Sequence, residues 1–193
     1  MRSIGITGGI GAGKSMICSI IETLGYPVFN SDKVAKTILS TDTSVINQIT
    51  TLFGESAYIN GVYNKPFIAK SIFGNQKLLE SINSIVHPAV QAEFKSWASQ
   101  QSSNLVFNEA AILFETNSYQ RFSNTILVTS PIDLRITRIK KRDNVTEEQV
   151  LARMSKQWPD EKKIPLADYV IVNDESQLII PQVLETLKQL EAF

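Results

Sequence analysis

One eight-residue segment near the amino terminus constrains the fold more than any other feature of the chain. It reads Gly8-Gly9-Ile10-Gly11-Ala12-Gly13-Lys14-Ser15 and matches the pattern G-x-x-x-x-G-K-[ST]. A strand is expected before it at residues 3–7. A helix is expected after it, where apolar residues recur at helical spacing: Ile17, Ile20, Ile21 and Leu24. This pattern, between a strand and a helix, predicts a phosphate-binding loop.

The residue types of this loop suit a nucleoside triphosphate. Glycines allow a tight turn that directs successive backbone N–H groups at phosphate oxygens, and the following helix adds the positive end of its dipole. Lys14 is expected to reach the β- and γ-phosphates, and the Ser15 hydroxyl is expected to ligate Mg²⁺. The alternative, a glycine-rich turn without a ligand, is disfavoured by the flanking strand and helix.

Composition excludes several other classes of protein. The 193 residues contain 19 Lys and Arg and 19 Asp and Glu, and 43% are hydrophobic, which fits a single ordered domain with insertions. A net charge of zero argues against a nucleic-acid or polybasic membrane partner, and no apolar run is long enough for a membrane span. Cys18 is the one cysteine, so a reducing compartment is expected, and no signal peptide is recognisable, which predicts a cytoplasmic protein. The oligomeric state is left open, and a monomer is allowed.

Short apolar strands alternate with helices along the chain. Besides residues 3–7, strands are expected at residues 26–29, 105–107, 125–129 and 169–172. This alternation predicts an α/β fold with a five-stranded parallel sheet covered by helices on both faces. The helical pattern over residues 43–102 is too long for a plain crossover, so it predicts an inserted helical region. Its long second part is expected to be interrupted at His87-Pro88.

Two acidic residues follow expected strands and therefore lie at the carboxyl edge of the sheet, where α/β proteins bind ligands. Asp32 is the candidate to orient a substrate hydroxyl and accept its proton, although it could instead cap the next helix. Glu109 could hold Mg²⁺ through a water molecule, although it could also be a solvated loop acid. His87, the one histidine, is more often structural than catalytic in such a place.

Residues 135–163 carry nine basic and five acidic side chains. Arg135, Arg138 and Arg142 share one expected helical face, and Arg153 lies on the next helix. Ile132, Ile136 and Ile139 are expected to form a separate apolar face. Arginines on a mobile flap above a phosphate loop would neutralise charge during phosphoryl transfer. A solvated basic face is an alternative, and a nucleic-acid patch is disfavoured because interleaved aromatic residues are missing.

These segments together resemble the dephospho-coenzyme A kinase family over nearly the whole chain. The resemblance is carried by the extended amino-terminal signature from Gly5 to Ser15 and by further motifs in the same order as in the family. They are Ser31-Asp32, Val86-His87-Pro88, Ile112-Leu113-Phe114-Glu115, Arg138 to Arg142-Asp143, Arg153 to Gln157, and Lys163 to Ile171.

The resemblance implies transfer of the γ-phosphate of ATP to the ribose 3′-hydroxyl of dephospho-coenzyme A, with Mg²⁺ as metal. It implies that the loop, especially Gly11 to Met16, binds ATP, that Asp32 is the base, and that Arg138 and Arg142 are lid arginines. His87, Glu109 and Arg153 join Asp32 as candidate substrate-binding residues. The implied division is a core (1–42, 103–136 and 166–193), a helical substrate-binding region (43–102) and a lid (137–165).

Two positions depart from the family pattern. Asn30 stands where the family often has an aspartate, and Ala111 stands where it often has a proline. Two other readings of the chain stay open at this point. One is a related small-molecule or nucleoside monophosphate kinase of the same fold, and the other is a nucleotide-gated binding module in which Asp32 is only a helix cap.

Overall fold

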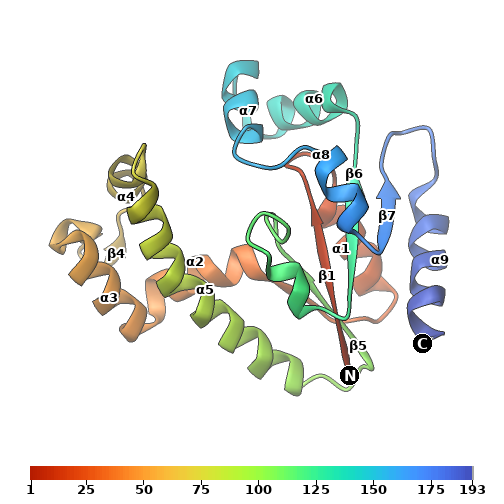
Figure 1. The fold of residues 1–193 in the computed structure, drawn as a ribbon, viewed down its shortest axis with the longest axis horizontal. Coiled ribbons are helices and arrows are strands. Elements are labelled where there is room, and N and C mark those ends of the chain that lie inside the picture. Colours follow the sequence, from red (N-terminus) through yellow and green to blue (C-terminus); the bar gives the residue numbers. More distant parts are fainter. Residues whose placement is uncertain (193) are drawn as a thin grey trace. The chain divides into compact units, whose positions relative to one another are not determined.

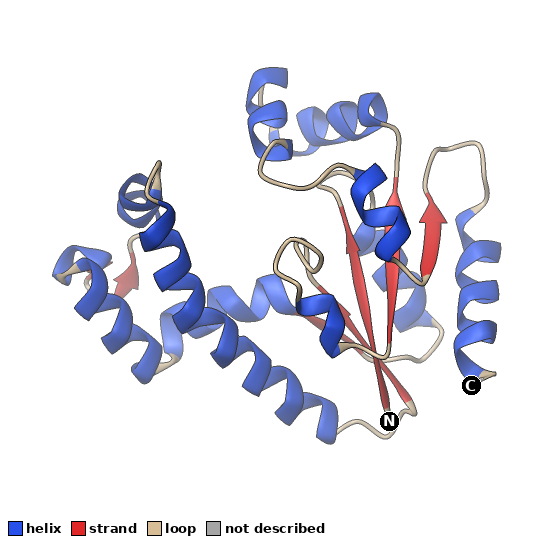
Figure 2. Cartoon of the chain, viewed as in Figure 1, coloured by secondary structure: helices blue, strands red, loops and turns tan. Residues whose placement is uncertain are grey.

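The computed structural model describes residues 1–192 and confirms the predicted α/β architecture. Its main sheet has five strands in the order β2-β5-β1-β6-β7 (Figures 1 and 2). The strands are β1 (Arg2–Gly8), β2 (Val28–Asn30), β5 (Leu105–Glu109), β6 (Asn124–Thr129) and β7 (Tyr169–Val172). All five were expected from the sequence, each within a few residues of its observed limits.

The register of the parallel strands decides which side chains meet at the carboxyl edge. Ile6 of β1 lies opposite Glu109 of β5, and Gly8 lies opposite Val128 of β6. Since β1 leads directly into the glycine-rich loop, the last residue of β5 lies beside the start of that loop. The pairing of β1 with β5 thus places Glu109 at the carboxyl edge of the sheet, beside the loop.

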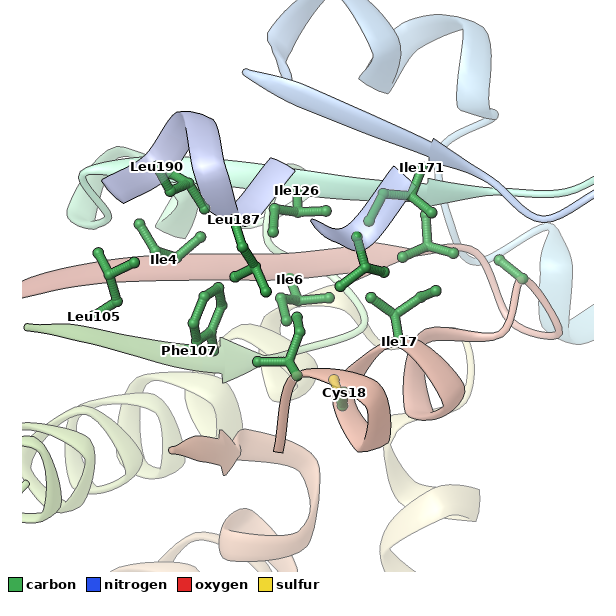
Figure 3. Close-up of a cluster of buried hydrophobic side chains, with 14 residues drawn as sticks. Ile4, Ile6, Ile17, Cys18, Leu105, Phe107, Ile126, Ile171, Leu187 and Leu190 are labelled. Carbon is green, nitrogen blue, oxygen red and sulfur yellow. The ribbon is translucent and has the colours of Figure 1, made fainter. Parts of the chain in front are cut away.

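One face of the sheet is covered by α1 (Lys14–Thr23) and α9 (Ile179–Glu191). On this face, Ile4 and Ile6 of β1 are fully buried against these helices. Figure 3 shows the cluster, in which Ile17 and Cys18 of α1 and Leu187 and Leu190 of α9 approach the strands. Ile4 and Ile6 share this face because successive side chains of a strand point to opposite faces of the sheet.

The opposite face of β1 packs against the segment that follows β5. Leu113 and Phe114 of this segment are buried. A Cβ atom on Gly5 would lie 2.8 Å from Cδ1 of Leu113, so the Leu113 side chain packs directly against the backbone of β1. A short helix, η2 (Ser118–Arg121), then leads into β6.

Between β6 and β7 the chain forms α6 (Ile132–Asp143), α7 (Glu147–Met154), α8 (Asp160–Lys163) and η3 (Ile164–Leu166). The apolar face expected on α6 is wrong in part. Ile139 is buried, but Ile132 is 56% exposed, whereas Arg135 is only 6% exposed. Arg135 turns inward because its guanidinium finds buried acceptors, and hydrogen-bonded acceptors offset the cost of removing a charge from water.

Residues Asn30–Gln100 form a separate compact unit, while Met1–Phe29 and the residues from Gln101 onward form the core unit. The helical unit contains α2 (Ser31–Thr41), α3 (Thr43–Phe53), η1 (Glu55–Ala57), α4 (Lys65–Ile72) and α5 (Gln76–Ser99). It has its own apolar core, in which Ile49, Ile68 and Ile82 are buried. Its boundary at Asn30 includes α2, which the sequence-based division had assigned to the core.

Two local features of the helical unit differ from expectation. Helix α5 continues through Pro88 instead of breaking there, and buried residues such as Ile82, Val86 and Ala98 anchor it on both sides of the proline. A small hairpin of β3 (Tyr58–Ile59) and β4 (Val62–Tyr63) was not expected. Its turn is Asn60-Gly61, both with positive φ, which is a recognised hairpin signal.

Candidate active site

The glycine-rich loop connects β1 to α1 and has a backbone that only glycine adopts easily at Gly13. This residue has φ 100° and is the residue before the first turn of α1. A Cβ atom there would also lie 2.2 Å from Nδ2 of Asn173. The left-handed turn directs the amino end of α1, which begins at Lys14, toward the space above the loop.

Lys14 lies back over the loop that precedes it. Its Nζ donates hydrogen bonds to the backbone carbonyls of Gly8 (2.9 Å) and Gly9 (3.4 Å). These bonds hold a positive charge beside the loop amides and the start of α1. The combination of oriented N–H groups, a helix start and an ammonium group makes a site for a polyphosphate.

Ser15, in the first turn of α1, meets Glu109 at the end of β5. The Ser15 Oγ lies 3.5 Å from Glu109 Oε1, and Glu109 is only 7% exposed. A hydroxyl and a carboxylate are hard oxygen donors of the kind that Mg²⁺ takes. Among residues 1–192 no cluster of three or more His, Cys, Asp or Glu could hold a metal. This donor set fits Mg²⁺, which keeps several waters and phosphate oxygens as ligands.

Cys18 lies one turn further along α1 and is buried. Burial, and secondarily the nearby carboxylates of Glu109 and Glu22, raises the pKa of its thiol well above the ordinary value. Because the thiolate is the reactive form of cysteine, this residue has no nucleophilic character and serves as core packing.

Arg138 projects from α6 to the edge of the loop. Its guanidinium donates to Ser130 Oγ (3.0 Å), to the backbone and side-chain oxygens of Asn173, and weakly to the Gly11 carbonyl (3.5 Å). It also forms an ion pair with Glu175 at 2.9 Å. The sequence-based placement of Arg138 near the loop agrees with these contacts. The contacts with Asn173 and Glu175, which follow β7, had no sequence signal.

Arg142 and Arg153 converge on one acid. Arg142 Nε lies 2.7 Å from Asp143 Oδ1, and Arg153 Nη1 lies 2.6 Å from Oδ2 of the same carboxylate. Hydrogen bonding to Arg142 and Arg153, aided by their charges, lowers the pKa of Asp143 to about 2. Both arginine side chains are largely exposed. Solvent-exposed pairs of this kind contribute little to stability, so a polyphosphate could compete for either arginine.

Asp32 and His87 belong to the helical unit, whereas the other candidate residues belong to the core unit. Asn30, not Asp32, caps α2, because its side chain accepts a hydrogen bond from the Lys33 N–H at 2.8 Å. Asp32 lies exposed in the first turn of α2, and His87 is exposed on α5. The cap reading of Asp32 is therefore wrong, and an asparagine suits the position where the family often has aspartate.

Two other polar residues of the core unit were not singled out from the sequence. Gln157 accepts a hydrogen bond from the Ile10 N–H at 2.8 Å. Lys163, with no exposed side-chain surface, forms an ion pair of 2.8 Å with Glu115. Gln157 and Lys163 both lie in motifs that carry the family resemblance. Those motifs were the only sequence signal that could have pointed to these two residues.

None of the helices within residues 1–192 combines the length and the apolar character that a membrane crossing needs.

A family model described as dephospho-CoA kinase matches residues 2–178. Among curated relatives, the dephospho-CoA kinase of Bacteroides fragilis is 36% identical over 95% of this chain and 90% of its own length. That of Porphyromonas gingivalis is also 36% identical, over 97% of this chain and 94% of its own.

Solved structures agree with these sequence relatives. The Thermus thermophilus protein TT1252 has a TM-score of 0.86 and 30% identity, covering 99% of this chain and 96% of its own. The dephospho-CoA kinase of Campylobacter jejuni has a TM-score of 0.70 and 23% identity, covering 97% and 96%. The shikimate kinase of Acinetobacter baumannii, with a TM-score of 0.55 and 17% identity over 100% and 93%, shares the fold.

Proposed function

The chain belongs to the dephospho-CoA kinase family, and from that premise we propose which of its residues perform the family's reaction. That reaction is the ATP-dependent phosphorylation of the ribose 3′-hydroxyl of dephospho-coenzyme A, which gives coenzyme A and ADP and completes coenzyme A biosynthesis. One observation supports this assignment of residues above all. The Ser15 hydroxyl lies beside the Glu109 carboxylate, next to the loop whose Gly8 carbonyl accepts a hydrogen bond from Lys14.

The phosphate loop is the proposed site for the triphosphate of ATP. The backbone N–H groups of Gly11 to Met16 would bind the β- and γ-phosphates, and Lys14 would exchange its loop carbonyls for phosphate oxygens. The left-handed turn at Gly13 and the start of α1 orient these N–H groups. Fixed donors favour the transition state, in which negative charge moves between the transferred and leaving groups, without reorganisation during the reaction.

Ser15 and Glu109 are the proposed holders of Mg²⁺, with Ser15 as a direct ligand and Glu109 acting through a water molecule. When bound, the metal would neutralise charge on the β- and γ-phosphates. The burial of Glu109 at the end of β5 keeps its carboxylate in one position. Its alternative, a freely solvated loop acid, does not agree with that burial.

Asp32 is the proposed group that orients the acceptor hydroxyl and takes its proton. As the 3′-oxygen forms its bond to the γ-phosphorus, the bond from that phosphorus to the β–γ bridging oxygen breaks and ADP leaves with the electron pair. The proton of the hydroxyl passes to the Asp32 carboxylate. Asn30 supports this role because it caps α2 and leaves the Asp32 side chain available.

The arginines of α6 and α7 are proposed to complete the site from the lid. Arg138 already lies at the loop edge, and Arg142 and Arg153 would exchange the shared Asp143 carboxylate for anionic groups of the substrates. His87 and Arg153, with Glu109, stay in the proposed substrate-binding set. A cytoplasmic location also stays part of the proposal and rests on composition alone.

The test of this assignment uses the purified chain with ATP, Mg²⁺ and a panel of acceptors. We expect ADP and coenzyme A to form with dephospho-coenzyme A, and much slower turnover with adenylate, cytidylate or shikimate. Lys14→Ala should lose both ATP affinity and rate, because Lys14 binds phosphate in the ground state and the transition state. Faster turnover of another acceptor would overturn the substrate assignment, and unchanged ATP affinity in Lys14→Ala would overturn the loop assignment.

A further inference from the structure

The backbone of Ile10, in the middle of the phosphate loop, is held on both sides by side chains from the segment between β6 and β7. The Ile10 N–H donates to Gln157 Oε1 at 2.8 Å. The Ile10 carbonyl accepts from Arg135 Nε at 2.9 Å. One residue of the loop thus has both of its main-chain polar groups paired with side chains far away in sequence.

Each of the two side chains is itself fixed by a second bond. Gln157 Nε2 donates to the Ala111 carbonyl, after β5, at 3.1 Å. Arg135 Nη1 forms an ion pair of 3.4 Å with Asp160, and both side chains are largely buried. A side chain that is already anchored by one bond loses little freedom when it also binds Ile10, so Ile10 is held by rigid supports rather than by mobile surface chains.

Gly9 shows how closely Arg135 approaches the loop. A Cβ atom at this position would lie 2.0 Å from Nη2 and 2.4 Å from Cζ of Arg135. The φ of Gly9 is not in the left-handed region, so backbone conformation does not require glycine there. The requirement for glycine at this position comes from the guanidinium that lies against it.

We propose that Gln157 and Arg135 are positioning residues, which hold the phosphate loop at Ile10 in the shape that binds the triphosphate. The proposal rests on the assignment of this loop as the ATP site. Neither side chain belongs to the groups proposed above to bind the phosphates or the acceptor. Gln157 fixes the peptide plane before Ile10 and Arg135 fixes the peptide plane after it, and these two planes determine the direction of the amides that follow. Through Gln157, residues after α7 are also attached to the loop.

The test replaces Gln157 by methionine, which keeps the length of the side chain and removes both hydrogen bonds. A matched control is Gln182→Met, because Gln182 also pairs by its amide with the N–H (2.8 Å) and carbonyl (3.0 Å) of one residue, Val172. Val172 is the last residue of the edge strand β7. Both variants lose similar bonds to backbone, but only Gln157 holds the loop.

The measurements are thermal unfolding, ATP affinity by calorimetry without acceptor, and kcat and KM for each substrate. A neutral hydrogen bond changes an equilibrium by roughly two- to tenfold. We expect Gln157→Met to weaken ATP binding by about that factor and to raise the KM for ATP. The KM for dephospho-coenzyme A should stay within twofold. Gln182→Met should lower the unfolding temperature without altering either value.

The proposal is overturned if Gln157→Met binds ATP as the unchanged protein does, or if Gln182→Met weakens ATP binding equally. A second variant, Gly9→Ala, tests the Arg135 side without removing a buried charge. It should displace the guanidinium and weaken ATP binding at least as much, and unaltered binding would overturn the role of Arg135. The Lys14→Ala variant distinguishes a failure of this proposal from a failure of the loop assignment on which it rests. If that variant also binds ATP normally, the loop assignment itself has failed.

Discussion

The Ser15 hydroxyl lies 3.5 Å from Oε1 of Glu109, although 94 positions separate the two residues in sequence. The pairing of β1 with β5 brings them together, since Ile6 lies opposite Glu109 in the sheet. Glu109 is buried, with 7% of its surface exposed, so its carboxylate is held among the elements that surround it. A hydroxyl and a fixed carboxylate at this spacing are the natural holders of one octahedral cation.

Glu109→Gln removes one negative charge from this pair and keeps the size of the side chain. We expect the Mg²⁺ concentration for half-maximal rate to rise, and kcat at ordinary Mg²⁺ to fall by about 10- to 100-fold, the range found when groups that orient a metal are replaced. Rate against Mg²⁺ concentration measures both. The control is Glu22→Gln, an exposed change on α1. An unaltered Mg²⁺ requirement in Glu109→Gln would contradict the metal assignment.

Asp32→Asn separates proton transfer from nucleotide binding. We expect kcat to fall by roughly 10²- to 10⁴-fold, the usual contribution of a general base, while the ATP dissociation constant stays nearly unchanged. Asn30→Ala is the matched change, because it removes the cap of α2 and should lower stability by about 1 kcal/mol without a comparable loss of kcat. Rapid-quench turnover and calorimetry check both. Full activity in Asp32→Asn would refute the role of base.

Lys163→Met tests the buried ion pair with Glu115. The ammonium has no exposed surface, and the carboxylate lies 2.8 Å away. Removing one member leaves an uncompensated charge, so we expect a loss of about 3–5 kcal/mol in the free energy of unfolding. The double variant Lys163→Met/Glu115→Gln should recover much of this loss. Additive losses in urea denaturation would show that the pair does not interact.

The loop and the strands could be predicted because their signals are local. Glycines at fixed spacing mark the turn before Lys14, and short apolar runs mark the five strands. Asp32 and Glu109 could be named because each directly follows such a run. The same reasoning predicted which residues lie at the carboxyl edge of the sheet. It did not predict which distant side chains they contact there.

Arg135 and Lys163 show why the rest could not be predicted. A charged side chain is buried only when a partner is in place, and the partners of Arg135 are the Ile10 carbonyl and Asp160, which no local pattern indicates. The helical period therefore placed Ile139 inside correctly, but it also placed Ile132 inside and Arg135 on an outer face. The predicted interruption of the helix at Pro88 was wrong for a related reason. Packing of residues on both sides of Pro88 outweighs the local cost of proline in a helix.

Asp143 should titrate far below an ordinary aspartate. Its pKa is lowered from 3.8 to about 2 by Arg142 and Arg153. Because the pKa in the folded state is depressed, the pairing is complete above about pH 4 and is lost as the pH falls through about 2. Carboxyl NMR of labelled aspartates would measure this midpoint. The Asp143 side chain is partly exposed, at 24%, so 1 M salt should move the midpoint upward. A midpoint near 4 at low salt would show that the arginines do not pair with Asp143 in solution.

Ligand binding should order only part of the segment 137–165 that the sequence assigned to a lid. Helix α7 buries a single residue, Val150, and the ion pairs at its ends are exposed. By contrast, Gln157 is attached to Ile10 and Lys163 is buried against Glu115. We therefore expect hydrogen exchange in residues 142–154 to slow when ATP and dephospho-coenzyme A bind together, while residues 160–165 stay equally protected with and without ligands. Slowing across the whole of 137–165 would show that the anchors at Gln157 and Lys163 open in the free protein. No change in residues 142–154 would show that α7 does not close over the phosphates.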